Sequence, residues 1–303
     1  MIASSLFHIV LLLLMPPLLL GVINRTKAAF AGRRGAPVLQ SYYDIAKLLR
    51  KGSVFSETTT WVFRAGPVVT LAATLVAALL VPLGGHPALV SFNGDMILFA
   101  YLFGLARFFT TSAALDTGSS FEGMGAAREV TFACLVEPTL FFAFITLARM
   151  SKTLSLTPML SYPSPEVWAD AGATLLLLVG ALFVTLLAEN CRIPFDDPNT
   201  HLELTMIHEV MVLDHSGPSF GLILYSAALK LFLMGAVFVS LALPFRTGNM
   251  TADWGLFILA MLLVSVLIGV VESVMARLRL VRVPQLLVAA TILSAFAMLL
   301  IVR

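Results

Sequence analysis

Six ionisable side chains lie inside or at the ends of long apolar stretches of this 303-residue sequence. They are Arg107, Glu129, Glu137, Glu189, Lys230 and Glu272. A charge placed in a bilayer costs about 2.5–3.5 kcal/mol on insertion scales, so such residues usually face protein or water and mark an ion pathway. Their types and positions therefore predict proton or ion movement.

Glu137 is the strongest candidate because it lies in the middle of an apolar stretch and precedes Pro138. Proline removes a backbone hydrogen bond and loosens the helix at that point, where water or a side chain can enter. We favour a proton-carrying role for this carboxylate. The structural alternative is an ion pair with Lys230 or Arg107.

Glu129 precedes Glu137 by eight residues, so both carboxylates lie near one helical face, about 12 Å apart along the axis. At that separation they cannot share a hydrogen bond, but water could relay a proton between them. Glu189 and Asp196 continue the acidic series further along the chain. This row is typical of a proton path or a coupling element.

The composition identifies the environment of these groups. The chain is 59% hydrophobic and 12% charged, with a mean hydropathy of +0.97, whereas soluble domains contain about 45–50% apolar and 25% charged residues. This excludes a soluble enzyme and a disordered chain. The net charge of +2 implies no nucleic-acid partner. Two cysteines cannot by themselves supply the four ligands of an iron–sulfur cluster or a structural zinc site, and we expect no metal or cofactor on this chain.

The predicted fold class is an all-α integral membrane protein, a bundle of about eight transmembrane helices with two long cytoplasmic loops. A span needs about 20 apolar residues. Eight stretches qualify: Leu6–Ile23, Pro67–Leu83, Met96–Ala114, Val130–Leu147, Gly172–Ala188, Phe220–Leu243, Trp254–Val271 and Pro284–Val302. A signal peptide is the disfavoured alternative for the first stretch, which no basic residue precedes. We expect residues 1–303 to form a single membrane domain.

Basic residues set the expected orientation, because cytoplasmic loops carry an excess of Lys and Arg. They concentrate in the loop after the first span and again in the loop after the seventh. Both termini should therefore lie on the non-cytoplasmic side. The two long cytoplasmic loops are residues 24–66 and 189–217.

Each long loop contains a predicted helix. In the first, Val38–Lys51 is amphipathic and forms either an interfacial helix or a helix packed on the bundle. Its expected apolar face comprises Leu39, Tyr42 or Tyr43, Ala46 and Leu49. In the second loop, Asp197 and Pro198 are typical of a helix start. The apolar stripe expected after it comprises Leu202, Met206, Ile207, Val210 and Leu213.

Three histidines in the second loop, His201, His208 and His215, recur every seven residues. Seven helical residues rise about 10 Å, too far for the three to share one metal ion. We expect solvated loop histidines. The sequence also lacks a phosphate loop, a nucleophile elbow and a zinc-protease motif, so we expect no catalysis by this chain alone.

Four features together resemble the subunit 1, or NuoH, family of respiratory complex I. The segment AENCRIPFDDP (Ala188–Pro198) resembles the family signature at the end of the fifth span. Arg128 and Glu137 resemble its charged pair in the fourth span. RRGAPVLQSYYDIAKLL (Arg33–Leu49) is similar to its first cytoplasmic loop. The eight spans and their orientation also fit.

Further segments are similar to one branch, the membrane anchors of energy-converting nickel–iron hydrogenases such as hydrogenase-4 and formate hydrogenlyase. These segments are LDTGSSFEGMGAAREVTFACLVEP (Leu115–Pro138) and ESVMARLRL (Glu272–Leu280). HLELTMIHEVMVLDHSG (His201–Gly217) departs from the common complex I pattern, aligning mainly at Glu203 and Leu204 and at the closing Ser-Gly.

The resemblance implies a subunit at the heel of an L-shaped complex, beneath a peripheral redox arm. It implies a proton or coupling path through Glu129, Glu137, Glu189, Asp196, Glu203, Lys230 and Glu272. It also implies counter-charges and arm-interface residues at Arg33, Arg34, Arg107, Arg128, Arg192, Asp197 and Glu209.

The implied partners are hydrogenase large and small subunits, an iron–sulfur subunit and antiporter-like membrane subunits, in the inner (cytoplasmic) membrane. Iron–sulfur clusters and the nickel–iron site would lie in those partners. The main alternative is the quinone-binding NuoH subunit of an NADH- or ferredoxin-quinone oxidoreductase. A secondary transporter is disfavoured because we find no paired inverted halves, and a purely structural anchor stays open.

Overall fold

The computed structural model describes residues 2–196, 206–244 and 247–302. Within these ranges the chain is helical, and its extended backbone forms only an isolated bridge between Leu83 and His86. Eight of the described helices are long and apolar enough to cross a membrane. The predicted fold class, an all-α membrane bundle with about eight spans, is confirmed.

Each long helix contains or overlaps one predicted span. The eight are α1 Ile2–Phe30, α3 Trp61–Leu80, α4 Asp95–Asp116, α5 Ser120–Ser151, α7 Pro165–Glu189, α8 Gly217–Ala242, α9 Met250–Val274 and α10 Val283–Val302. Most of these helices are longer than the predicted apolar stretch, because helical backbone hydrogen bonding continues past the first charged residue. In particular, α5 begins at Ser120 rather than Val130, so Glu129 lies within a helix.

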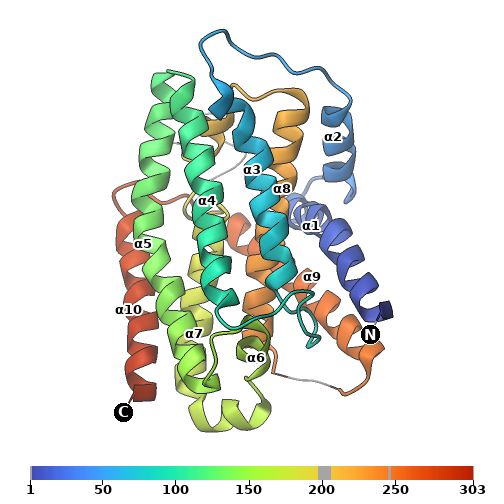
Figure 1. Ribbon diagram of the computed structural model, residues 1–303, viewed down its shortest axis with the longest axis vertical. Helices are drawn as coiled ribbons and strands as arrows, with labels where there is room; N and C mark the ends of the chain where they lie inside the picture. Colours follow the sequence, from blue (N-terminus) through green and yellow to red (C-terminus); the bar gives the residue numbers. More distant parts are fainter. Residues whose placement is uncertain (1, 197–205, 245–246, 303) are drawn as a thin grey trace.

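Helix α8 is the centre of the bundle and contacts α1, α3, α7 and α9. Figure 1 shows α1 and α9 on one side of it, while α10 lies on the opposite side against α5 and α7. Both chain termini lie toward the same end of the molecule in this view. An even number of membrane crossings requires this arrangement.

Small residues let α3 and α4 approach closely. A Cβ atom added at Gly66 in α3 would lie 2.9 Å from Ala113 Cβ and 3.3 Å from the Phe109 carbonyl oxygen of α4. One turn further along, the Thr70 and Thr110 hydroxyls are 3.1 Å apart and share a hydrogen bond. This contact fixes α4, which carries Arg107, against the bundle.

The short helix α2 (Gln40–Leu49) packs against α8 and α1. Its half-buried side chains are Gln40, Ser41, Tyr42, Ile45 and Leu48. Of the predicted apolar face, Tyr42 is half-buried, while Leu39, Ala46 and Leu49 are exposed, where an interfacial helix would turn them toward the membrane. Ser41, Asp44 and Ile45 of α2 line a cavity described below.

The second long loop is less helical than predicted in its described part. A single 3₁₀ turn, η1 (Glu209–Val212), and the short helix α6 (Leu156–Ser161) complete the described elements. Met206, Ile207 and Val210 are buried as expected, but Leu213 is exposed. The predicted helix start at Asp197 and Pro198, with Leu202, lies outside the described residues.

Replacing Gly66 by valine is expected to separate α3 from α4, because the new side chain would overlap Ala113 and backbone of α4. Overpacking of this kind costs about 1–3 kcal/mol. The thermal midpoint of the detergent-solubilised protein should fall. Gly104→Val is the matched control, since nothing lies within 4 Å of a Cβ atom at Gly104. Equal midpoints for the two variants would contradict this packing.

Candidate functional site

Arg107 of α4 binds carboxylates from two other helices. Its Nη2 atom donates to both oxygens of Glu189 at the end of α7, at 2.7 and 2.8 Å. Its Nη1 atom donates to Glu137 of α5. Its Nε atom lies 3.4 Å from Oε1 of Glu129, also on α5. One guanidinium therefore joins three carboxylates.

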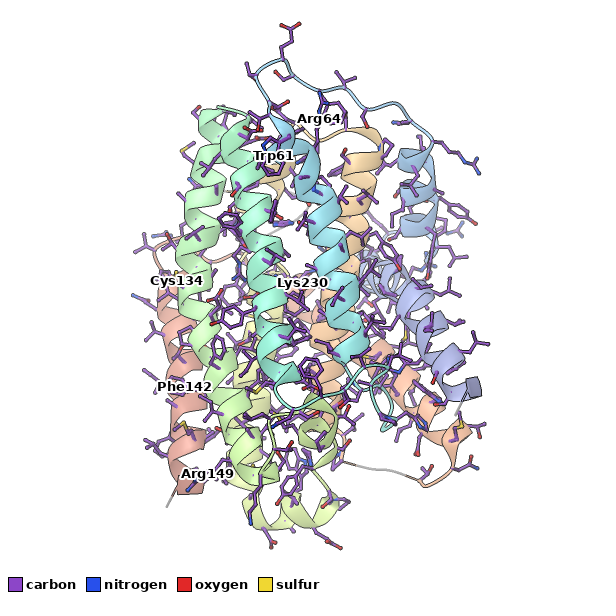
Figure 2. The ribbon with its side chains drawn as sticks, viewed as in Figure 1. Trp61, Arg64, Cys134, Phe142, Arg149 and Lys230 are labelled. Carbon is purple, nitrogen blue, oxygen red and sulfur yellow. The ribbon has the colours of Figure 1, made fainter. Side chains whose placement is uncertain are left out.

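Lys230 of α8 adds a second cation to this group. Its Nζ atom lies 2.6 Å from Oε2 of Glu189. Figure 2 shows Lys230 between the two ends of the bundle, with Arg64 toward one end and Arg149 toward the other. We call Arg107, Glu129, Glu137, Glu189 and Lys230 the charge cluster.

The charge cluster is mostly shielded from solvent. The side chains of Glu189, Arg107 and Glu129 are 7%, 11% and 15% exposed. Glu137 differs, because 46% of its side-chain surface is open. It shares an uncovered face of α5 with Val130, Cys134, Phe141 and Ile145. The cluster thus runs from the interior of the bundle to its outer surface.

The pairing of Glu137 settles which cation lies beside it. The sequence left Lys230 and Arg107 as alternative partners, and the structure places Arg107 there. Arg107 can also reach Glu129, because the eight-residue spacing puts both carboxylates on one face of α5. The Arg107 side chain therefore lies between Glu129 and Glu137, where a bridging water was expected.

The chain turns sharply where α7 ends, and the turn is a Schellman motif. The amide of Arg192 donates to the Leu187 carbonyl at 2.8 Å, and the amide of Cys191 donates to Ala188 at 3.1 Å. Cys191 occupies the left-handed position of this motif with φ +49°. Glycine is usual there, because a Cβ atom is disfavoured in that conformation.

A second set of ion pairs holds the segment that follows. Oδ1 of Asp196 lies 2.7 Å from Arg277, and its Oδ2 atom accepts hydrogen bonds from the Ile207 and His208 amides at 2.9 and 3.2 Å. The buried carboxylate of Glu272 pairs with Lys27 at 2.8 Å and lies 3.4 Å from Arg192. Sequence reasoning missed Arg277 and Lys27, since each is distant in the chain from its partner.

The remaining predicted residues lie apart from the charge cluster or outside the described chain. Arg128 donates to the Met206 carbonyl at 2.8 Å. Arg33 and Arg34 are exposed beyond the end of α1. Glu209 opens η1 and is half-buried. Asp197 and Glu203 lie outside the described residues.

A cavity of about 380 Å³ opens beside the charge cluster. Its wall includes Arg107, Glu129, Glu189 and Lys230, and α2 contributes Ser41, Asp44 and Ile45. Residues of α1, α3 and α8 complete it, together with Cys191, Arg192, Asp196 and His208 from the segments around η1. At about 30 Å³ of liquid volume per water molecule, the space is enough for on the order of ten waters.

The prediction of solvated histidines is wrong for His215. His215 is 8% exposed and its ring stacks on Phe63 with the ring centroids 4.0 Å apart. Burial lowers the pKa of His215 to about 4. His208 is half-buried and lines the cavity. The seven-residue spacing of the histidines gives no information about packing against residues distant in the chain. His201 lies outside the described residues.

The fold and this site together define a class: a polytopic helical membrane protein with a paired charge cluster beside an internal cavity. Such a cluster can hold a proton or respond to a charge that moves nearby. A family model described as NADH dehydrogenase matches residues 3–303. The chain belongs to this family of membrane subunits.

Two relatives from Escherichia coli (strain K12) are each 32% identical to this chain. Hydrogenase-4 component C aligns over 91% of this chain and 88% of its own length. Formate hydrogenlyase subunit 4 aligns over 89% of both chains. The NuoH subunit of the NADH-quinone oxidoreductase of Anaplasma phagocytophilum (strain HZ) is 26% identical over 68% of this chain and 63% of its own.

The fold matches that of a chain in the membrane-bound sulfane sulfur reductase, an archaeal respiratory membrane complex. The TM-score is 0.84 and the alignment covers 99% of both chains, at 21% sequence identity. This likeness establishes the helical architecture. The resemblance to the complex I subunit family that the sequence motifs indicated is confirmed.

Replacing Arg107 by glutamine is expected to destabilise the bundle, because it leaves buried carboxylates without their cation. Breaking a buried ion pair costs about 3–5 kcal/mol. The double variant Arg107→Gln/Glu189→Gln should recover part of the lost thermal stability, with a coupling of about 0.5–3 kcal/mol. The exposed Arg149 supplies the control, Arg149→Gln. Additive losses in the double variant would show that Arg107 and Glu189 do not act as a pair.

Proposed function

We propose that this chain is the membrane-anchoring and coupling subunit of a complex-I-like, redox-driven proton or ion pump. The proposed complex is a nickel–iron hydrogenase of the formate hydrogenlyase or hydrogenase-4 type. In this role the chain links electron transfer in a peripheral arm to ion translocation in the membrane. The names of its 32%-identical relatives support this assignment.

The observation that carries the proposal is the single guanidinium that holds carboxylates of α5 and α7. Glu189 lies next to the 190–196 turn, whose Asp196 and Arg192 are tied by ion pairs to the far end of α9 and the segment after it. A shift of this turn would therefore change the contact between Glu189 and Arg107. Arg107 would transmit that change to Glu129 and Glu137.

The charge balance of the cluster supports proton binding. Three carboxylates face two cations, Arg107 and Lys230, so the cluster carries one excess negative charge when every group is ionised. Unbalanced charge is costly away from water. Uptake of one proton would make the cluster neutral, and a change in the Arg107 contacts would alter which carboxylate holds it.

The outer end of the cluster favours a neighbouring membrane subunit. Glu137 is 46% exposed among apolar side chains on the uncovered face of α5. A carboxylate facing lipid at that depth would cost about 2.5–3.5 kcal/mol. An antiporter-like subunit docked on this face would cover Glu137 and receive the proton or the signal from it. Hydrogenase large and small subunits and an iron–sulfur subunit, which would hold the clusters and the nickel–iron site, complete the proposed set of partners.

The proposed location is the inner (cytoplasmic) membrane with both termini on the non-cytoplasmic side. The basic loop after α1 supports this orientation, as does the placement of both termini toward one end. We treat residues 1–303 as one membrane domain, because one hydrophobic cluster includes residues from α1, α8 and α10.

A Glu137→Gln variant tests the proposed function. Glutamine keeps the size of the side chain and can still accept a hydrogen bond from Arg107, but it cannot carry a proton. The number of protons translocated per electron, measured with the complex in vesicles, should fall about twofold or more, as expected for an intramembrane carboxylate on the pathway. Electron transfer to an artificial acceptor should persist.

The control for this experiment is Glu166→Gln, at the exposed opposite end of α7. It should translocate protons at the wild-type ratio. A wild-type ratio in a fully assembled Glu137→Gln complex would contradict the proton-carrying role and leave only a structural anchor.

The cavity favours a second candidate function, quinone binding in a NuoH subunit of an NADH- or ferredoxin-quinone oxidoreductase. Its volume and its position beneath α2 suit a ring-bearing lipid, and polar groups at Arg107 and His208 could orient the ring. Extraction of the purified complex with organic solvent tests this alternative. Quinone binding is favoured if the wild-type complex contains one quinone per complex and an Ala227→Trp variant, which blocks the cavity, contains none. Quinone binding is excluded if the complex is fully active without quinone.

A further inference from the structure

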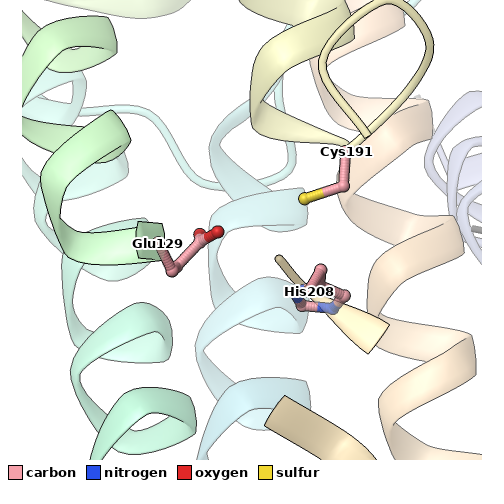
Figure 3. A group of neighbouring side chains, drawn as sticks. All are labelled: Glu129, Cys191 and His208. Carbon is pink, nitrogen blue, oxygen red and sulfur yellow. The ribbon is translucent and has the colours of Figure 1, made fainter. Parts of the chain in front are cut away.

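Three side chains of metal-ligand type converge beside the charge cluster, from segments far apart in the sequence. Glu129 comes from α5, Cys191 from the turn after α7 and His208 from the residue before η1. Figure 3 shows the three pointing toward one another. One ligand atom from each lies within 4.8 Å of the other two.

We propose that Glu129, Cys191 and His208 form a binding site for a divalent cation of the zinc class. Sulfur, imidazole nitrogen and carboxylate oxygen are the ligand atoms that zinc uses in proteins. Zinc bonds of about 2.0–2.3 Å would draw these atoms together by small side-chain rotations. Three protein ligands would leave a fourth position for water from the cavity, and the thiol discriminates against magnesium and calcium.

An unpaired nitrogen independently points to a ligand at this position. Nδ1 of His208 is buried and has no hydrogen-bond partner among the described residues. Buried polar atoms are nearly always paired, because leaving one unpaired costs about 1–3 kcal/mol. The His208 side chain also lines the cavity, which supplies both the space and the entry route for an ion.

The backbone conformation of Cys191 indicates that its thiol is retained at a cost. At φ +49° a Cβ atom is disfavoured by about 1–2 kcal/mol, and glycine would close the same Schellman motif without that penalty. The sulfur atom points toward Glu129 and His208. Ligation would offset the conformational cost of having a side chain at this position.

The surrounding charges favour a cation near the sulfur. The carboxylates of Glu129, Glu189 and Asp196 line the same cavity as the Cys191 thiol, as does the Lys230 ammonium. Carboxylates near the sulfur favour a divalent cation at the same place. The cation would then displace the thiol proton, as zinc does on binding cysteine.

Two of the three ligands are held by neighbouring groups. Asp196 accepts the His208 amide at 3.2 Å, which fixes the backbone beside the imidazole. The two hydrogen bonds of the Schellman motif hold Cys191. Positioning of this kind is typical of metal sites and contributes to their affinity.

Binding of zinc-65 to the purified whole complex tests the site. Equilibrium dialysis should give about one more bound zinc per wild-type complex than per Cys191→Gly or His208→Gln complex, with affinity at this site at least about tenfold weaker in each variant. Cys191→Gly suits the backbone of the turn, so loss of binding with normal assembly would reflect the missing thiol. The control is Cys134→Ser, which removes the other, exposed cysteine of the chain.

The proposal is overturned if wild-type and Cys191→Gly complexes bind equal amounts of zinc, or if Cys134→Ser loses as much binding as Cys191→Gly. Alkylation provides a second measurement within one molecule. In the purified chain, where the Cys134 face of α5 is uncovered, zinc should slow the modification of Cys191 by N-ethylmaleimide about tenfold or more and leave that of Cys134 unchanged. Equal modification of both cysteines with and without zinc would also contradict the site.

A zinc ion on Glu129 would compete with Arg107 for that carboxylate. The following expectation rests on the proposed function. Micromolar zinc should slow proton translocation in vesicles that contain the wild-type complex and not in vesicles that contain the Cys191→Gly complex. Zinc-65 binding without any slowing would support the metal site and count against Glu129 as part of the coupling path. The two proposals can therefore fail separately.

Discussion

A guanidinium inside a membrane bundle must be compensated by nearby negative charge, and Arg107 is the residue around which this chain meets that requirement. Its three nitrogens contact Glu129, Glu137 and Glu189, which draws α4, α5 and α7 into a fixed relation. Lys230 then balances Glu189 from the central helix α8. Removal of any one charge leaves another exposed to a low dielectric, so the cluster behaves as a unit.

The described segments next to this cluster, residues 190–196 and 206–208, also line the cavity. They are held by Asp196 and Arg192, each paired with a residue of α9 or the stretch after it. The same described residues include Cys191 and His208, so a shift of Asp196 or Arg192 would also alter the proposed metal site. In the proposed function, a peripheral arm would act on Glu189 through these segments.

The transmembrane helices could be predicted because apolar length is a local property, and all eight appear at the expected places. The candidate carboxylates were also visible as charges in apolar stretches. Their partners were not, since Arg107 and Glu189 are 82 residues apart and nothing in their local sequences pairs them. The same limit explains the error at His215. Its burial depends on stacking with Phe63, and the packing of α2 on α8 is likewise a contact that local periodicity cannot reveal.

The central claim is that one guanidinium couples three carboxylates, and proton translocation per electron in an Arg107→Lys complex tests it most directly. Lysine keeps the positive charge but lacks the planar fork that binds several carboxylates at once. The complex should therefore assemble and transfer electrons, while its proton-to-electron ratio falls below that of the wild type. An unchanged ratio would mean that charge balance alone is needed at this position, and that the bridging geometry has no part in coupling.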